Sequence, residues 1–384
     1  MTVVSLPPEV WMYIQRLATS ETSPLTLAYA DRFQYVPHAD PLEHLEGFLR
    51  AACSFALVCR LFNSVATDIL YENVRVDERF PILRTALEGR DAGRLVRSIR
   101  LSPRHSEHNY EILALCPFVQ VIVQPDDGLP IFSGRVSVVS SPSREPVLPE
   151  LLALRHVYCS ELLIDSRLLI EVLQTSPNIE YLSVMQSPYT LPVDALALLG
   201  LPAIANLKGL ALPLLVRQAI PSSIFRMNLQ GLTRLHCFPS TLALAEFPTL
   251  PSLHVLEILG SRSTMFFPLI FSRCPRLHEL CYDVRNSQSL RCYDVQGRLT
   301  PLPRSSSLSI IHLHSAVTVE YDWLSFRAHF GLFLGPGFPV FPRLVLHGSQ
   351  WHRVVADPKF TSRFVYGLRR RGCRLEFPEG HVLM

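Results

Sequence analysis

The chain has 384 residues, of which 48% are hydrophobic and 18% are charged, and its mean hydropathy is +0.22. This composition excludes an intrinsically disordered protein, and the length favours a small module followed by a larger body over a single domain. The net charge of +3 is too small to predict binding to nucleic acid or to a membrane surface.

The first predicted element is a helix that begins near Pro7. A proline suits the first helical position, where the backbone amide needs no partner, and Glu9 can accept from the free amides of the first turn. Apolar residues then recur at helical spacing, with a tryptophan beside them: Val10, Ile14, Leu17 and Trp11.

A polar stretch follows this helix. It contains Pro24 and Pro37, and we predict an inserted loop over residues 20–40. A helix restarts at Asp40, because an N-cap, a proline and then an acidic residue follow one another as Asp40-Pro41-Leu42-Glu43. A further apolar helix is predicted over residues 55–66.

The first and last of these helices resemble an F-box. The family pattern is Leu-Pro-x-Glu, then an Ile and a Leu on the first helix, then Leu-Val-Cys-Arg-x-aromatic. This chain has Leu6-Pro7-Pro8-Glu9 and Leu57-Val58-Cys59-Arg60-Leu61-Phe62. It departs from the pattern at Phe62, where Trp is commoner, and in the about 37 residues between the two stretches. That insertion is similar to those in F-box proteins of filamentous and mushroom-forming fungi.

The resemblance implies a docking module. An F-box ties its protein to the linker subunit of a cullin-based, SCF-type ubiquitin ligase, so the chain would be a substrate adaptor with that subunit and a cullin as partners. The residues that would bind the linker subunit are Leu6, Pro7, Pro8, Val10, Trp11, Ile14, Leu17, Leu57, Val58, Cys59 and Phe62. The alternative is an ordinary amphipathic pair of helices that begins a helical domain.

From residue 95 onward the pattern apolar-x-x-apolar-x-apolar recurs. Copies begin at residues 96, 154, 179, 207, 232, 253, 277 and 308. Between Val157 and Leu280 the central apolar residues are spaced within the range of about 20–29 residues that is typical of leucine-rich repeats. Later candidates at Ile311, Leu344 and Leu375 are spaced more widely. The Asn that usually closes each turn is absent, so the copies resemble the irregular repeats of F-box proteins.

Helices are predicted between these strands, most clearly over residues 165–176 and also over 110–115 and 265–273. One strand and one helix per repeat predict an α/β leucine-rich-repeat-like solenoid, a horseshoe, whose strands line the concave side. We assign residues 1–76 to the helical F-box-like module and 77–384 to this solenoid, with loop insertions near 126–150 and 285–307. A closed α/β domain with parallel strands is the alternative.

The positions between the repeated apolar residues form the predicted target-binding surface. In a solenoid, such side chains are expected on the concave face. They are Arg97, Arg100, Arg155, Tyr158, Tyr181, Arg234, His236, His254, Glu257, His278 and Glu279. Tyr and Arg are frequent interface hot spots, and Arg suits carboxylate or phosphate, so we expect an acidic or phosphorylated protein segment. The alternative is a solvated polar face without a single partner.

The sequence contains no motif of a catalytic or metal centre. A phosphate-binding loop, a nucleophile elbow and a His-Glu-x-x-His helix are all absent. His105 and His108 lack the further ligands of a zinc site, and Cys59 is expected to pack within its helix. We therefore predict no enzyme activity, no metal and no cofactor. Two alternatives to the adaptor function are open. One is an unrecognised enzyme such as a hydrolase, which would need a clustered nucleophile, base and carboxylate. The other is a repeat scaffold in which the F-box-like helices only cap the solenoid.

The sequence also predicts a soluble protein of the cytoplasm and/or nucleus. The N-terminus lacks the pattern of a secretory signal, and the most apolar stretch, residues 193–216, is interrupted by prolines and polar residues. The nine cysteines have no Cys-x-x-Cys spacing, which is typical of reduced thiols. We expect no membrane partner and no nucleic acid partner.

Overall fold

The structure is a computed structural model. It describes residues 7, 10, 13, 53–54, 56–58, 60–89, 91–102, 106–124, 148–159, 166–184, 206–212, 229–237, 249–258, 267–284, 307–314, 323–335, 338–348, 350–378 and 380–383. The chain forms two compact units, Met1–Asn206 and Leu207–Met384. The predicted loop 20–40, the helix restart at Asp40 and nearly all of the insertions near 126–150 and 285–307 lie outside the described residues.

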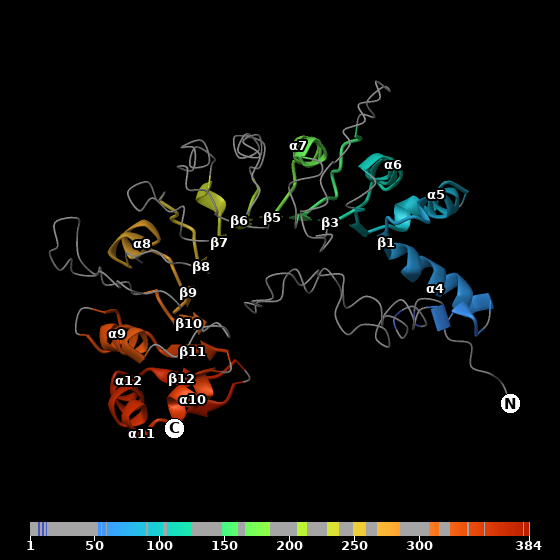
Figure 1. The fold of residues 1–384 in the computed structure, drawn as a ribbon. Coiled ribbons are helices and arrows are strands. Elements are labelled where there is room, and N and C mark those ends of the chain that lie inside the picture. The colour runs from blue at the N-terminus through green and yellow to red at the C-terminus, as the bar shows by residue number, and fades with distance from the viewer. Residues whose placement is uncertain are drawn as a thin grey trace, which may run out of the picture. The chain divides into compact units, whose positions relative to one another are not determined.

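In the first unit, parallel strands pair in chain order and helices lie along one side of them (Figure 1). The strands are β1 (Asn73–Arg75), β2 (Ser98–Arg100), β3 (Val121–Gln124), β4 (His156–Cys159) and β5 (Tyr181–Val184). The helices are α4 (Arg60–Glu72), α5 (Phe80–Gly89), the 3-10 turn η1 (Ala92–Leu95), α6 (Ser106–Leu115) and α7 (Ser166–Thr175).

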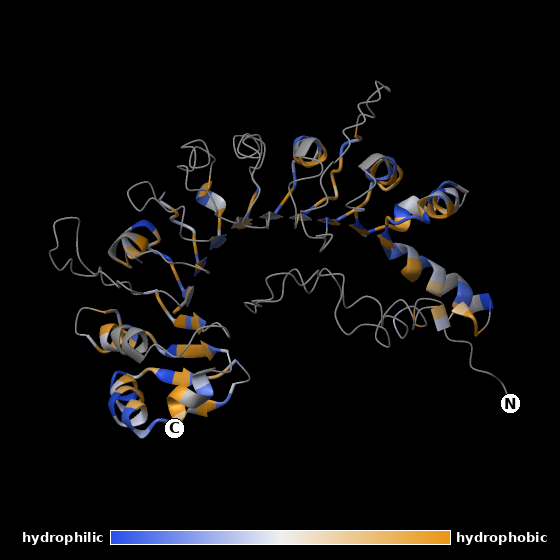
Figure 2. Cartoon of the chain, viewed as in Figure 1, coloured by the Kyte–Doolittle hydropathy of each residue, from blue (hydrophilic) through white to orange (hydrophobic). Residues whose placement is uncertain are grey.

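The core of the first unit follows from the period-two alternation of its strands. One row of paired residues crosses all five strands, and every member is buried: Val74, Ile99, Ile122, Val157 and Leu182. The apolar faces of α6 and α7 cover this side of the strands, as the colouring of Figure 2 shows. Burial of each such side chain contributes about 1.5–3 kcal/mol.

The second unit repeats this plan over more strands. Seven strands run parallel in chain order: β6 (Gly209–Leu212), β7 (Arg234–Cys237), β8 (Val255–Ile258), β9 (Glu279–Asp283), β10 (Ile310–His314), β11 (Arg343–His347) and β12 (Arg374–Glu376). A short last strand, β13 (Val382–Leu383), pairs with β12 in the antiparallel direction.

Short helices join these strands. They are the 3-10 turn η4 (Leu229–Gly231), α8 (Phe267–Arg273), α9 (Trp323–Leu334), α10 (Gln350–Ala356), α11 (Pro358–Phe360), the π-helical turn η7 (Thr361–Val365) and α12 (Tyr366–Arg370). Aromatic side chains of α8 and α9 fill the core beside the strands. Phe267 packs edge-on against Tyr282 of β9, with ring centroids 5.9 Å apart, and Phe330 and Phe333 are fully buried.

The predicted α/β class, with parallel strands and intervening helices, is confirmed by this topology. Each predicted repeat copy forms a strand, and helices form where they were predicted, as α6, α7 and α8. Three strands, β1, β3 and β13, were not predicted. Since β1 lies within residues 1–76 and pairs with β2, the sheet begins inside the range that we assigned to the helical module. No helix among the described residues is both long and apolar enough to cross a lipid bilayer.

Candidate functional site

Each unit has a face of its sheet that points away from the helices, which we call the non-helical face. In the second unit, Tyr282 marks the opposite side, because it contacts Phe267 of α8 and hydrogen bonds to His329 of α9. Successive strand residues point to opposite faces. Residues 279 and 281 of β9 therefore belong to the non-helical face, as do their partners in register on the neighbouring strands.

The structure divides the eleven predicted target-binding residues into two groups. Seven lie within strands at positions that alternate onto the non-helical face: Arg100, Tyr158, Tyr181, Arg234, His236, Glu257 and Glu279. Four directly precede a strand: Arg97, Arg155, His254 and His278. The sequence pattern treated both groups as equivalent, because each lies between two apolar residues of a repeat.

Two arginines of the second group bind the turns next to them. Arg97 donates to the carbonyls of Arg94 and Val96 at 2.6 and 3.2 Å. Arg155 donates to the carbonyls of Leu152 and Leu154 at 3.0 and 3.3 Å. These guanidinium groups therefore satisfy backbone carbonyls at the turns that enter β2 and β4, and we do not count them among the groups presented to a partner.

The non-helical face of the first unit combines arginine and aromatic side chains. Arg75 and Arg100 are paired in register on β1 and β2. On β4 and β5, the rings of Tyr158 and Tyr181 lie 5.2 Å apart, and His156 contacts the Tyr181 ring edge-on at 6.2 Å. Guanidinium and tyrosine groups on the same face of the sheet are suited to binding a protein segment that carries carboxylate or phosphate.

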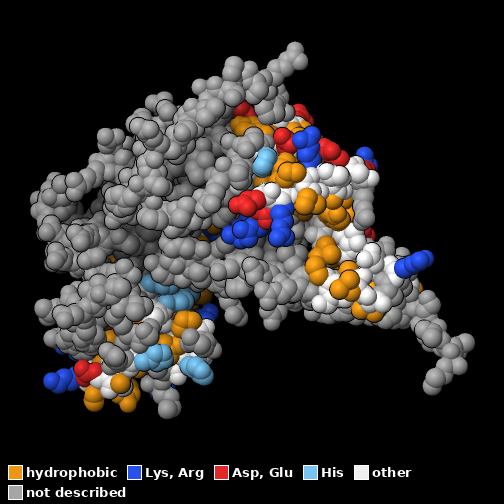
Figure 3. Space-filling model, turned by 45° about the vertical axis from the view of Figure 1, so that its right-hand side comes forward, with side chains coloured by type: hydrophobic (Ala, Val, Ile, Leu, Met, Phe, Trp, Pro, Cys, Tyr) orange, Lys and Arg blue, Asp and Glu red, His pale blue; other side chains and the backbone are white. Residues whose placement is uncertain are grey.

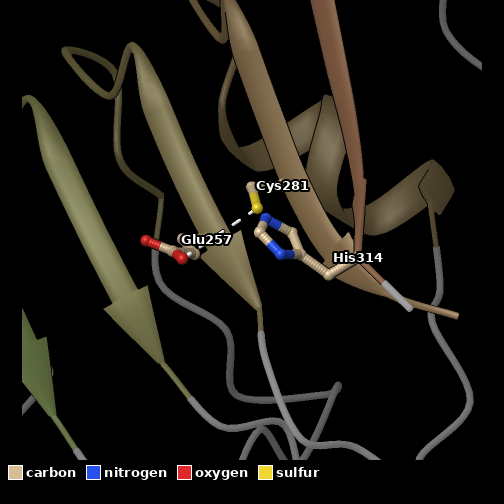
Figure 4. Close-up of side chains that lie close together, drawn as sticks. All are labelled: Glu257, Cys281 and His314. Atoms are coloured by element: carbon tan, nitrogen blue, oxygen red, sulfur yellow. Dashed lines mark hydrogen bonds between the residues drawn. The ribbon is translucent and has the colours of Figure 1, made fainter. Parts of the chain in front are cut away.

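The non-helical face of the second unit holds a cluster of three potential metal ligands, Glu257, Cys281 and His314, which we call the Glu-Cys-His cluster (Figure 4). They come from the adjacent strands β8, β9 and β10. One donor atom of each lies within 4.8 Å of the other two, and all three residues are buried. The Cys281 Sγ lies 4.0 Å from Glu257 Oε1.

Further histidines surround this cluster. His236 Nδ1 lies 2.9 Å from Glu257 Oε2, the carboxylate oxygen that does not face Cys281. The ring of His347 stacks on that of His314 at 4.3 Å, and its Nε2 lies 2.8 Å from His312 Nδ1. Figure 3 shows histidine side chains near one another on the part of the surface formed by the second unit.

Burial fixes the protonation state of His314. Loss of hydration, followed by the fields of His347, His312 and His236, lowers the pKa of His314 from 6.5 to about 3. The imidazole is therefore neutral at physiological pH, which is the form that can accept a proton or bind a metal ion.

Sequence reasoning missed Cys281 and His314. It named Glu257 and His236 but treated each repeat separately. The missing signal was the register, because Glu257, Cys281 and His312 occupy the same position in three successive copies and are paired on neighbouring strands. His314 lies two residues beyond His312 and so shares its face.

A thiol, an imidazole and a carboxylate in one place are also the groups of a cysteine hydrolase. A catalytic thiol must be accessible and favour its thiolate form, whereas Cys281 is fully buried and faces the Glu257 carboxylate. Four other buried cysteines have pKa values raised to about 12 by burial: Cys116, Cys159, Cys274 and Cys373. None of these five thiols is suited to nucleophilic attack.

Of the predicted linker-binding residues, the structure describes five positions. Pro7 and Val10 are exposed, Leu57 and Val58 are 88% and 62% exposed, and Phe62 at the start of α4 is half-buried. The others, Leu6, Pro8, Trp11, Ile14, Leu17 and Cys59, lie outside the described residues.

No family model matches this chain, and no match is found among curated proteins. The F-box resemblance therefore rests on the motif residues alone. What the described residues add is the exposure of part of that motif and the composition of the non-helical faces.

Proposed function

We propose that the chain is a substrate-recognition adaptor of an SCF-type ubiquitin ligase. The F-box-like residues would bind the linker subunit and, through it, a cullin, and the repeat sheet would hold a target protein. The observation that carries the proposal is the exposure of large apolar side chains in the motif, Leu57, Val58 and Val10, together with Tyr13 beside Val10 in the first predicted helix. Apolar side chains of this size are stabilised by a partner that removes them from water.

The adaptor would perform no bond-making chemistry. It would raise the local concentration of a target near a conjugating enzyme that carries ubiquitin as a thioester. For short flexible links this local concentration reaches about the millimolar range. The gain in rate would come from proximity and orientation. This role is served in the cytoplasm or nucleus, where the described cysteines would stay reduced.

The target would bind the non-helical faces. In the first unit the neighbouring arginines Arg75 and Arg100 and the tyrosines Tyr158 and Tyr181 favour an acidic or phosphorylated segment. Arg155 is less suited to this task, since its guanidinium group already binds backbone carbonyls.

Binding to a purified fungal SCF linker subunit tests the proposal. The wild-type chain should bind, and the double variant Leu57→Asp, Val58→Asp should bind at least about tenfold more weakly, because each buried side chain of this size contributes about 1.5–3 kcal/mol. Ile82→Asp is the matched control, since Ile82 on α5 is 72% exposed but lies outside the motif. Equal binding by the double variant and the control would contradict the proposed interface.

The second candidate is a repeat scaffold without a role in ubiquitin transfer. It is favoured by α4, which carries the end of the motif and runs directly into β1. Ala66 and Ile69 of α4 are buried, and the Glu72 carbonyl accepts from the Arg97 amide at 2.8 Å. The second half of this helix therefore packs against β1 and η1, as a solenoid cap would. Failure of the wild-type chain to bind the linker subunit would select this function.

A further inference from the structure

We propose that the Glu-Cys-His cluster of the second unit binds one Zn²⁺ ion through Glu257, Cys281 and His314. The inference does not depend on the ubiquitin-ligase function, because it concerns side chains of β8, β9 and β10 alone.

The donor set matches zinc. Zn²⁺ binds cysteine thiolate, histidine nitrogen and carboxylate oxygen, and sites with three protein ligands leave the fourth tetrahedral position to water. Softer thiolate and imidazole ligands also favour zinc over Mg²⁺ or Ca²⁺, which prefer oxygen.

The distances fit with little rearrangement. Tetrahedral coordination at ordinary zinc–ligand lengths places the donor atoms about 3.3–3.6 Å from one another. The three donors here lie within 4.8 Å of one another, and Cys281 Sγ is 4.0 Å from Glu257 Oε1. Small rotations of the side chains would close the remaining gap.

The sheet itself explains why these side chains converge. The shortest of the three, Cys281, comes from the central strand β9, and the longer Glu257 and His314 come from the strands on either side. Parallel strands lie about 4.8 Å apart, so the two outer side chains can reach over β9. Figure 4 shows the three side chains on the same face of the sheet, with a dashed line for the hydrogen bond between Cys281 and Glu257.

One residue outside the three ligands, His236, holds the Glu257 carboxylate in place. His236 Nδ1 contacts the far oxygen of the Glu257 carboxylate at 2.9 Å, which orients the other oxygen toward Cys281. Such outer partners fix the orientation of metal ligands and raise metal affinity about 10- to 100-fold.

The charges also balance. On binding, the Cys281 thiol would release its proton to solvent and form the Zn–S bond, so that one thiolate and one carboxylate neutralise the divalent ion. This matters because all three residues are buried, and an unbalanced charge is costly there. The ion would join β8, β9 and β10 and stabilise this part of the second unit.

Cobalt substitution tests the site on the full chain, produced without a histidine tag and stripped with a chelator. Titration with Co²⁺ should produce a thiolate-to-cobalt charge-transfer band and the visible bands of a tetrahedral ion, saturating at one equivalent, and Zn²⁺ should abolish both. Cys281→Ser should remove the charge-transfer band. Glu257→Gln and His314→Gln should each weaken Co²⁺ binding at least about tenfold.

The controls are a cysteine and a histidine pair outside the cluster. Cys53→Ser removes an exposed thiol, and the double variant His254→Gln, His278→Gln removes two exposed imidazoles whose rings lie 5.5 Å apart. Both should leave the cobalt spectrum unchanged. Loss of the spectrum in either control, with its retention in Cys281→Ser, would overturn the assignment.

X-ray absorption of the zinc-loaded wild-type chain gives a test that needs no variant to fold. One sulfur at about 2.3 Å and two or three nitrogen or oxygen atoms near 2.0–2.2 Å are expected. A zinc shell without sulfur, or a wild-type chain that gives no cobalt spectrum with an equivalent of Co²⁺, would refute the site.

Discussion

The hydroxyl of Tyr282 lies 2.9 Å from Nδ1 of His329, and this hydrogen bond joins β9 to α9 inside the core of the second unit. Both groups are buried. Burial lowers the pKa of His329 from 6.5 to about 3 and raises that of Tyr282 well above 10. The pair is therefore neutral throughout the physiological pH range.

Stability should consequently fall as the pH drops below about 6.5. In this range the unfolded chain protonates His329, whereas the folded chain keeps it neutral down to about pH 3. The free energy of unfolding should decrease by about 1.4 kcal/mol per pH unit for this residue. Urea unfolding at several pH values would measure how steeply the free energy of unfolding changes with pH, and this dependence should be smaller by about that amount in His329→Asn. An unchanged pH dependence would contradict a neutral His329 in the folded chain.

We expect Gly93→Ala to destabilise the first unit. A Cβ at position 93 of η1 would collide with the backbone carbonyl of Leu115 at the end of α6, and a backbone group cannot rotate away. The cost should be about 1–3 kcal/mol, which thermal unfolding can measure. Gly331→Ala in α9 is the control, because nothing lies within 4 Å of the added Cβ. That change should be neutral or stabilising by up to about 1 kcal/mol.

Asn109 should be hard to replace. Its side chain accepts from the Ser102 amide at 2.8 Å and donates to the Ser102 carbonyl at 2.7 Å, and Asn109 is only 1% exposed. Asn109→Ala would leave two buried backbone groups without these bonds, at a cost of about 2–4 kcal/mol in the free energy of unfolding. Asn178→Ala, which removes one bond to the Leu152 carbonyl, should cost less than half as much. Equal losses would argue against the bridging role.

The ion pair between Arg343 and Glu376 joins β11 to β12. Arg343 approaches both carboxylate oxygens, with its closest contact at 2.8 Å, and the Glu376 side chain is only 7% exposed. Because Arg343→Ala leaves a buried carboxylate whose remaining cationic partner, within the described part of the chain, is the more distant Arg374, it should cost about 1–3 kcal/mol.

A surface pair provides the comparison for this prediction. Arg84 lies 2.9 Å from Glu88 and 2.7 Å from Glu111, but all three side chains are nearly half exposed. Arg84→Ala should therefore cost less than about 1 kcal/mol. A larger loss from Arg84→Ala than from Arg343→Ala in urea unfolding would contradict the importance of burial here.

The strands of the repeats could be predicted because their signal is local. An apolar residue such as Leu256 or Leu280 recurs at the centre of each copy, and the interval between copies is set by one strand and its return segment. β3 was missed although Val121, Ile122 and Val123 form an apolar run. Its residues are buried on both faces and do not alternate with polar ones.

The candidate metal site could not be read from any one repeat. Glu257, Cys281 and His314 are separated by 24 and 33 residues, and only the register of three strands brings them together. Similarly, the pattern could not distinguish Arg100, within a strand, from Arg155, whose hydrogen bonds depend on the turn before β4. The partners of the F-box-like residues stay a prediction, since they belong to another molecule.

The antiparallel strand β13 has a consequence for the behaviour of the protein at high concentration. An uncovered edge strand offers unpaired amides and carbonyls to the sheet of a neighbouring molecule. Here Val382 and Leu383 pair with Glu376 and Leu375, so β12 is covered by a strand of only two residues. Such a short edge strand is a poor template for pairing with a strand of another molecule. We therefore expect β13 to reduce edge-to-edge aggregation at this end of the second unit.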